Sequence, residues 1–186
     1  SGGTFLCDLA SVATGGGGVN DLVAMSGGTL NLSGGATVTP MFLNGPLTNS
    51  AYTLISGGAA TSGSAANVTW GGGTGGRQTL AFDTTTLGAL NLVVSGTPAA
   101  NLVWAGLVNS TWDIGTANWL NGAAQEQFFN LDAVTFDNSG SGSPNVSLSG
   151  TVSPSAINVN ASSSYTFNGP GAYAGGGSLN KSGSGS

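Results

Sequence analysis

The chain has 186 residues, of which 34 are glycine, and only 5% are charged. Two basic residues, seven acidic residues and no histidine give a net charge of −5. A nucleic-acid-binding protein needs many lysines and arginines to neutralise phosphates, so this class is excluded, as is binding to an anionic membrane surface. Without histidine, the commonest general base and the commonest metal ligand are both absent. No apolar stretch approaches the roughly 20 residues of a membrane span, so we expect no membrane insertion.

Short runs in which apolar and small polar residues alternate occur along the whole chain. This period of two is typical of β-strands with one buried face. In chain order, the runs predict strands at residues 29–33, 51–55, 67–70, 78–82, 90–94, 101–104, 133–136, 145–148, 156–159 and 164–167. Clusters of Gly, Asn, Ser or Pro separate them. One short helix candidate, at 123–130, lacks a sustained amphipathic period, so we expect negligible helix.

The outer faces of the predicted strands carry Thr, Ser and Asn. A β-sandwich usually exposes charged side chains there, which also block pairing at its edges. Small polar side chains instead suit the close stacking of one coil on the next. We therefore favour an all-β solenoid (a β-helix), in which each coil contacts only its neighbours, with a sandwich or jelly roll as the alternative.

Alternation also predicts which side chains form the core of the second half. We expect Thr135 and Ser147 to point outward. The side chains expected to point inward are Val134, Phe136, Val146, Leu148, Ile157, Val159, Tyr165 and Phe167. A shift of one residue in register would exchange the two faces.

A series of motifs in the second half follows a recognisable order. It begins with Thr111-Trp112-Asp113, Thr116-Ala117-Asn118-Trp119 and Asp132-Ala133-Val134-Thr135-Phe136-Asp137, and it continues at residues 146–150, 152–154, 165–167 and 175–183. These segments resemble the start of a bacterial autotransporter-associated β-strand repeat. The first half is similar to the segment that closes such an array, through residues 3–6, 20–23, 27–32 and 52–55.

This resemblance implies a domain organisation and a function. Residues 1–103 would be the closing part of a β-solenoid array, and residues 104–186 the start of the next repeat unit. The implied role is that of an extracellular or cell-surface β-helical stalk without catalysis.

The acidic residues offer few sites for chemistry. Asp132 and Asp137 lie at opposite ends and faces of one predicted strand, whereas a glycosidase needs two carboxylates that converge on one sugar. Turn and strand-end roles explain them better. Asp8, Asp21 and Asp113 are candidate Ca²⁺ ligands, but no calcium-loop motif is present. We therefore expect no catalytic residue, no metal and no cofactor.

The two basic residues argue against an enzyme. A β-helical polysaccharide lyase needs a base and cations that neutralise a polyuronate. Arg77 lies in a predicted turn, and Lys181 lies far from it in the sequence. The single cysteine, Cys7, excludes an intrachain disulfide, and we expect it to be a buried apolar residue.

The tryptophans carry the alternative function. Trp112 and Trp119 bracket a predicted turn at Gly115. We favour mutual packing, which would shield a hydrophobic end from water. The alternative is an adhesin that presents these two rings to surface glycans.

The two ends of the chain predict self-association. Residues 1–10 are interpreted as a strand that opens a coil, and residues 178–186 as a strand that continues one. Strand edges without blocking charges invite further strands, and head-to-tail contacts propagate into filaments. We therefore expect the partner to be a second copy of the chain, in an end-to-end array or filament.

Overall fold

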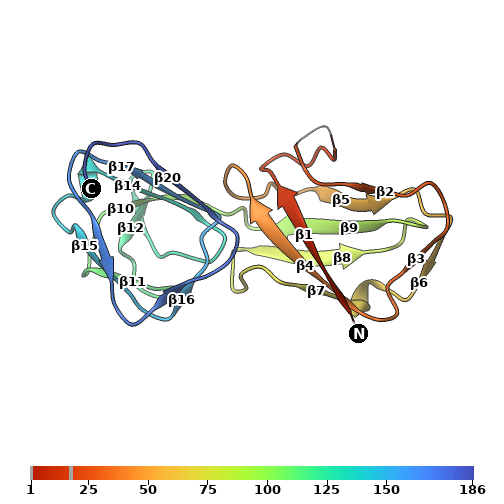
Figure 1. Ribbon diagram of the computed structural model, residues 1–186. Coiled ribbons are helices and arrows are strands. Elements are labelled where there is room, and N and C mark those ends of the chain that lie inside the picture. Colours follow the sequence, from red (N-terminus) through yellow and green to blue (C-terminus); the bar gives the residue numbers. More distant parts are fainter. Residues whose placement is uncertain (1, 17–18) are drawn as a thin grey trace. The chain divides into compact units, whose positions relative to one another are not determined.

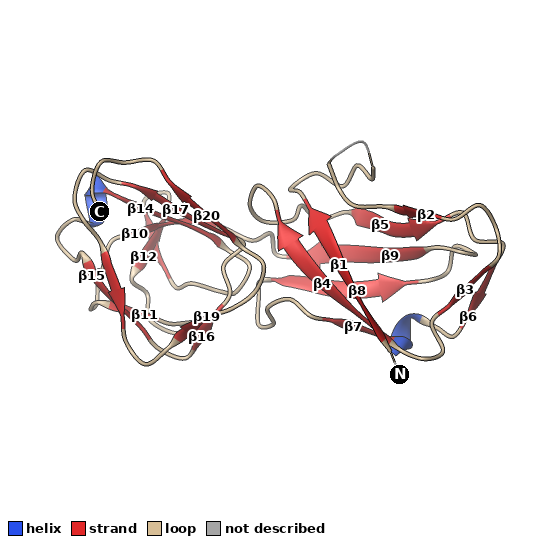
Figure 2. Ribbon diagram, in the orientation of Figure 1, coloured by secondary structure: helices blue, strands red, loops and turns tan. Residues whose placement is uncertain are grey.

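The computed structural model is all-β and describes residues 2–16 and 19–186 (Figures 1 and 2). Ser1, the first residue of the predicted opening strand, lies outside the described residues. The helical elements of the described chain are two 3-10 turns, η1 (Ala65–Asn67) and η2 (Asn138–Gly140). None of its helices is long and apolar enough to cross a membrane. The prediction of negligible helix is confirmed, and the helix candidate at 123–130 contains a strand.

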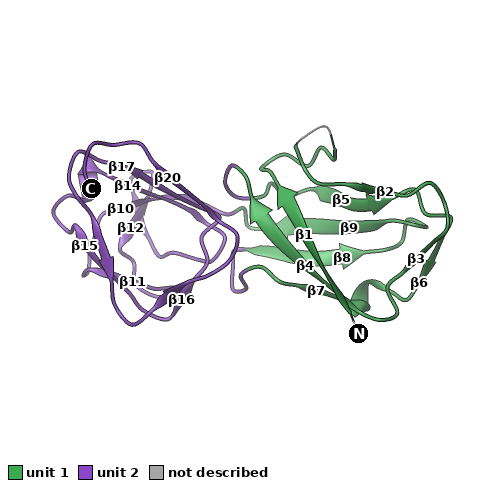
Figure 3. Cartoon of the chain, viewed as in Figure 1, with its two compact units in different colours: residues 1–43, 47–72, 78–98 green, residues 44–46, 73–77, 99–186 purple. Residues whose placement is uncertain are grey.

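The chain divides into two compact units (Figure 3). Unit 1 comprises residues 1–43, 47–72 and 78–98, and unit 2 comprises residues 44–46, 73–77 and 99–186. The boundary expected after residue 103 lies inside a strand of unit 2, β10.

The described residues of unit 1 form nine strands. They are β1 (Gly3–Leu9), β2 (Val23–Ala24), β3 (Thr29–Asn31), β4 (Ala36–Phe42), β5 (Ala51–Ser56), β6 (Ala60–Ser62), β7 (Val68–Trp70), β8 (Gln78–Asp83) and β9 (Leu90–Gly96). The first six make two passes of the chain, because β4, β5 and β6 pair in parallel with β1, β2 and β3 respectively. β7 then extends the first ladder in parallel, while β9 and β8 pair antiparallel beyond β5.

Unit 2 contains eleven strands. They are β10 (Asn101–Trp104), β11 (Thr111–Trp112), β12 (Trp119–Asn121), β13 (Ala124–Glu126), β14 (Ala133–Asp137), β15 (Asn145–Leu148), β16 (Thr151–Val152), β17 (Ala156–Asn160), β18 (Thr166–Asn168), β19 (Ala172–Tyr173) and β20 (Ser178–Lys181). Three parallel ladders run through the unit, in the orders β10-β14-β17-β20, β11-β15-β18 and β16-β19.

From β14 onward the ladders of unit 2 return at nearly constant intervals, whereas the first returns, from Asn101 to Ala133 and from Thr111 to Ser147, span 32 and 36 residues. Ala133 pairs with Ala156, and Ala156 with Ser178, so the chain rejoins this ladder after 23 and then 22 residues. The other two ladders join Asn145 to Thr166 and Thr151 to Ala172, which are 21 residues apart in each case.

Strand prediction from alternation was successful. Each of the ten predicted runs coincides with a strand or overlaps one, least of all the run at 164–167, which shares two residues with β18. The predicted register is also right, since Val134, Phe136 and Val146 are buried whereas Thr135 and Ser147 are only half-buried. The side chains of Leu148, Ile157 and Phe167 are more exposed than expected, because all three line a hollow at the end of unit 2.

Candidate functional site

The inward side chains of unit 2 become progressively exposed toward its last coil. The first column runs through the pairs Leu102–Val134, Val134–Ile157 and Ile157–Leu179. Leu102 and Val134 are fully buried, Ile157 is half-buried, and Leu179 is 70% exposed. The other two ladders behave alike, from buried Val146 to Phe167 (41% exposed) and from buried Val152 to Tyr173 (43% exposed).

These exposed ends surround an apolar hollow of about 320 Å³. The side chains that form it come from all three ladders. They belong to Trp112, Leu148, Ile157, Phe167, Tyr173 and Leu179, with Gly177 completing the lining. The expectation that Phe167 is a core residue is therefore wrong in degree. Its ring lies in the inner column and contacts Phe136, with ring centroids 4.9 Å apart, but no further coil covers it.

The strands around the hollow are edge strands. Within the described chain, β18, β19 and β20 each pair on one side only. At the opposite end of the main ladder, the hairpin of β12 and β13 covers β10 in antiparallel pairing. The main ladder of unit 2 is thus capped beside β10 and open at β20, while β11 and β16, which begin the other two ladders, also pair on one side only among the described residues. We call β18, β19 and β20 with the hollow the open C-terminal face.

Unit 1 has the reverse polarity. In the part of the chain that the structure describes, β1, β2 and β3 each pair on one side only, whereas the antiparallel strands β8 and β9 follow beyond β5. Its first pass is therefore open, although β6 and β7, at the other end of their ladders, also pair on one side only within the described ranges. We call β1, β2 and β3 the open N-terminal face.

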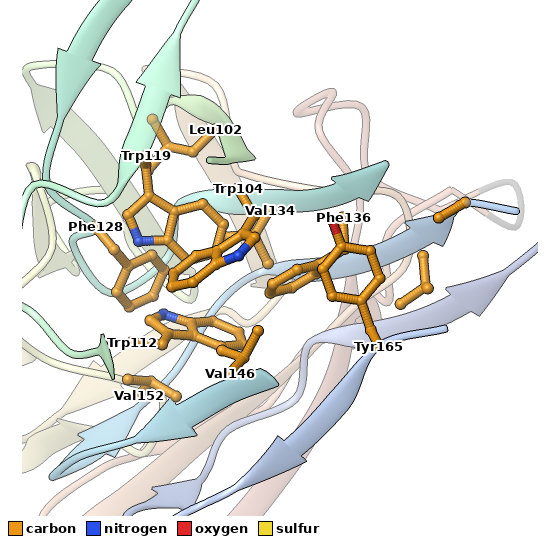
Figure 4. Close-up of a cluster of buried hydrophobic side chains, with 12 residues drawn as sticks. Leu102, Trp104, Trp112, Trp119, Phe128, Val134, Phe136, Val146, Val152 and Tyr165 are labelled. Carbon is orange, nitrogen blue, oxygen red and sulfur yellow. The ribbon is translucent and has the colours of Figure 1, made fainter. Parts of the chain in front are cut away.

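Trp112 and Trp119 lie in the core of unit 2 (Figure 4). Their exposed fractions are 1% and 0%, and their rings meet edge to face with centroids 5.3 Å apart. Trp119 also meets Trp104 edge to face at 5.0 Å. Such pairs contribute about 0.5–1.5 kcal/mol beyond the burial of area. Neither ring presents an exposed face that could stack on a sugar at the surface.

The indole N–H groups of Trp112 and Trp119 are buried without a nitrogen or oxygen acceptor. The ring of Phe128 lies at 90° to that of Trp112, and Figure 4 shows the Trp112 nitrogen on the side of Phe128 and Trp119. Trp104 differs, because its indole N–H donates to the Ser143 carbonyl at 2.9 Å.

Arg77 is the centre of a buried polar network in unit 2. Its Nε donates to both carboxylate oxygens of Asp132, at 2.9 and 3.1 Å, and its Nη1 to Glu126 at 3.2 Å. The Asp132 carboxylate, which is fully buried, also accepts from the backbone N–H of Ala100 and Phe129. Burial raises the pKa of Asp132, against the lowering effect of these donors. The hydrogen bonds that it accepts from Arg77, Ala100 and Phe129 favour its ionised form. We interpret the network as structural, because each nitrogen of the Arg77 guanidinium donates to an acceptor within the chain.

The remaining acidic candidates serve turns. Asp137 accepts from the Ser139 N–H at the start of η2, and Asp113 accepts from the N–H of Gly115 and Thr116. Burial acts to raise the pKa of Asp113, but the hydrogen bonds from Gly115 and Thr116 outweigh it and lower that pKa. Among the described residues, no group of three or more His, Cys, Asp or Glu side chains could hold a metal ion.

The charged residues at the two open faces were not foreseen. Lys181 lies on β20, and its Nζ donates to the Gly183 carbonyl at 2.6 Å. Asp8 lies on β1, and its N–H and C=O are both bonded to Asp21, through Oδ2 and N respectively. The expectation of ends without charge is therefore wrong, since one face carries a cation and the other carries two carboxylates.

Comparisons with protein-family models, with curated proteins and with solved structures found no match to this chain. The geometry of the chain itself must therefore carry the functional argument. Sequence reasoning placed the core residues but did not find the hollow, because period-two alternation identifies an inward side chain without revealing whether a further coil covers it.

Proposed function

We propose that this chain is a structural module, a β-solenoid that stacks end to end in an extracellular bacterial fibre, stalk or matrix and has no catalytic role. The solenoid is supported by the three parallel ladders of unit 2, whose partners recur every 21–23 residues from β14 onward. Parallel pairing between successive passes is what coil stacking produces, whereas a sandwich built of hairpins pairs its neighbours antiparallel.

The burial gradient of unit 2 is the observation that carries the stacking proposal. All three inner columns pass from buried side chains to large exposed apolar ones, at Leu179, Phe167 and Tyr173. Contiguous exposed apolar surface in a soluble protein marks an interaction site. A further β-coil is the occupant that would bury these side chains and also pair the edges of β18, β19 and β20.

The chemistry of the surface suits a spacer. The groups able to perform acid–base chemistry are engaged in structure, since Arg77, Glu126 and Asp132 form one network and Asp113 and Asp137 cap turns. The extracellular location rests on the resemblance of residues 104–186 to autotransporter-associated repeats. A glycan-binding adhesin has no specific observation in its favour, because Trp112 and Trp119 are buried.

Sedimentation velocity and electron microscopy test the proposal. The purified chain should form species that grow with concentration, and micrographs should show filaments of uniform width. A monodisperse monomer at millimolar concentration, with only discrete particles on the grid, would contradict the proposed function.

A further inference from the structure

We propose that the open C-terminal face of one copy binds the open N-terminal face of a second copy, through parallel pairing of β20 with β1. This inference rests on the proposed function and deepens it, because it names the partner surface, the strand pair and its direction. It is based on the polarity of the open faces, on the open edge of β1 and on the positions of the charged side chains.

The polarity of the two faces favours a head-to-tail contact. The open N-terminal face consists of the first passes of three ladders, and the open C-terminal face consists of the last passes of three ladders. A last pass followed by a first pass continues each ladder in parallel. A contact between two C-terminal faces about a two-fold axis would instead pair β20 with itself antiparallel, so it would not continue the parallel ladders.

Among the described residues, β4 is the one strand that pairs with β1, so the other edge of β1 is open to β20. The carbonyl of Leu9 accepts from Leu43 beyond β4, so odd-numbered residues of β1 bond toward β4. The N–H of Asp8 points the other way and is taken by Asp21. The N–H and C=O groups of Thr4 and Leu6 therefore face the open edge, and Gly3–Cys7 can receive the four residues of β20.

Charge selects the parallel direction. Lys181 lies at the C-terminal end of β20, and Asp8 lies at the C-terminal end of the free part of β1. Parallel neighbours are about 4.8 Å apart, which brings Lys181 within reach of Asp8 and Asp21. Antiparallel pairing would place Lys181 beside Gly3, about 16 Å from Asp8 at roughly 3.3 Å per residue. The burial of Leu179, Phe167 and Tyr173 would supply the affinity, and the ion pair would set the direction.

Two variants, each blocked at one face, test the contact by sedimentation velocity. Leu179→Asp places a charge in the hollow, and Leu6→Pro removes an N–H from the open edge of β1 without removing a bond to β4. Each variant alone should lose at least about 100-fold in association constant. Their mixture should form a one-to-one heterodimer, because each copy retains the face that the other lacks.

Matched controls separate these effects from general changes. Leu87→Asp alters a leucine that is 66% exposed in unit 1, and Leu6→Ala removes the same side chain as Leu6→Pro but keeps the N–H. Both should polymerise like the wild type. Lys181→Glu and Asp8→Lys should each weaken association about fivefold, and the double variant should recover it.

The outcomes distinguish this inference from the proposed function. A wild-type chain that stays monomeric overturns both. A wild-type chain that polymerises, while the mixture of the two blocked variants stays monomeric, overturns only the contact between β20 and β1. Homodimers of Leu6→Pro that persist in the absence of Leu179→Asp would instead indicate pairing between two C-terminal faces, and would also overturn the inference.

Discussion

The Nε atom of Arg77 lies 2.9 Å from Oδ1 and 3.1 Å from Oδ2 of Asp132, and this joins residues that are 55 positions apart. The segment that contains Arg77, residues 73–77, belongs to unit 2, although the strands on either side of it belong to unit 1. Asn130 strengthens the attachment, because its side-chain amide donates to the Thr74 carbonyl. The Cζ atom of the Arg77 guanidinium lies 4.5 Å from the centroid of the Phe129 ring, which adds a cation–π interaction.

Replacing Asp132 with asparagine should therefore destabilise unit 2 strongly. The substitution keeps the shape but removes the charge, which leaves the Arg77 guanidinium largely buried without its main partner. Loss of one member of a buried ion pair lowers the free energy of unfolding by about 3–5 kcal/mol. Urea unfolding followed by tryptophan fluorescence measures this. Glu126→Gln is the control, since its partner is the same arginine but its side chain is 30% exposed, and it should lose no more than about 1 kcal/mol. Equal effects of the two substitutions would contradict the assignment.

Phe136 lies at the centre of the aromatic core of unit 2, and its removal should be similarly damaging. Its ring is fully buried and lies within 6 Å, centroid to centroid, of the rings of Trp104, Trp112, Trp119, Tyr165 and Phe167. Truncation to alanine should lower the free energy of unfolding by about 3–5 kcal/mol, because the cavity is enclosed. Phe167→Ala, at the open face, should lower it by only about 1–2 kcal/mol in the monomer. Comparable losses would mean that Phe167 is covered in the isolated chain.

The sequence predicts a strand of this fold where apolar and small polar residues alternate without interruption. Alternation identified the ten runs because each inward side chain is followed by an outward small polar one. β4 was missed, because Pro40 interrupts the pattern of Ala36–Phe42. Even-numbered residues of β4 form their backbone hydrogen bonds toward β7, as the Val38 carbonyl does by accepting from the Gly71 N–H. Pro40 is even-numbered, but the pairing of β4 with β7 already ends at Val38. The proline therefore removes no ladder hydrogen bond.

The polar network and the open faces depend on contacts distant in sequence. Arg77 and Asp132 were each interpreted as isolated turn residues, and nothing in their local sequences indicates that they meet. One general rule could have suggested the pair, because a buried arginine almost always has a carboxylate partner. The burial of Trp112 and Trp119 follows from strand alternation, whereas the exposure of Leu179 depends on where coil stacking ends in space.

The close approach of Gly58 and Gly88 in unit 1 predicts a position where alanine is not tolerated. A Cβ atom on Gly88 would lie 1.9 Å from the Gly58 carbonyl oxygen, and φ at Gly88 is +68°. Gly28 is the matched control in the same unit, since φ is +77° there but no atom lies within 4 Å of the added Cβ. Gly28→Ala should lower the free energy of unfolding by about 1–2 kcal/mol through backbone strain alone. Gly88→Ala should lower it by about 2 kcal/mol more, because the backbones must separate. Equal losses in thermal or urea unfolding would show that the approach is not needed.

Cys7 on β1 should be unreactive in the folded chain and should make stability depend on alkaline pH. Its thiol is buried, as expected from the sequence, and this burial, followed by the charges of Asp21 and Asp8, raises its pKa from 9.0 to about 12. Because the thiolate is the reactive form, labelling with a disulfide reagent at pH 8 should be slow and should become complete when urea unfolds unit 1.

The sign of the pH effect follows from the neutral thiol being favoured in the folded state. The stabilisation is fully present below pH 9 and is lost as the pH rises toward 12, because the unfolded chain ionises first. The stability of the wild type should therefore fall more steeply than that of Cys7→Ala between pH 9 and 12, while the tyrosines titrate equally in both chains. Two outcomes would contradict this assignment: parallel stability curves for the two chains over this range, or rapid stoichiometric labelling of the folded protein at pH 8. Either would show that the Cys7 thiol is open to solvent and that the edge of β1 is less ordered than its contacts with Asp21 indicate.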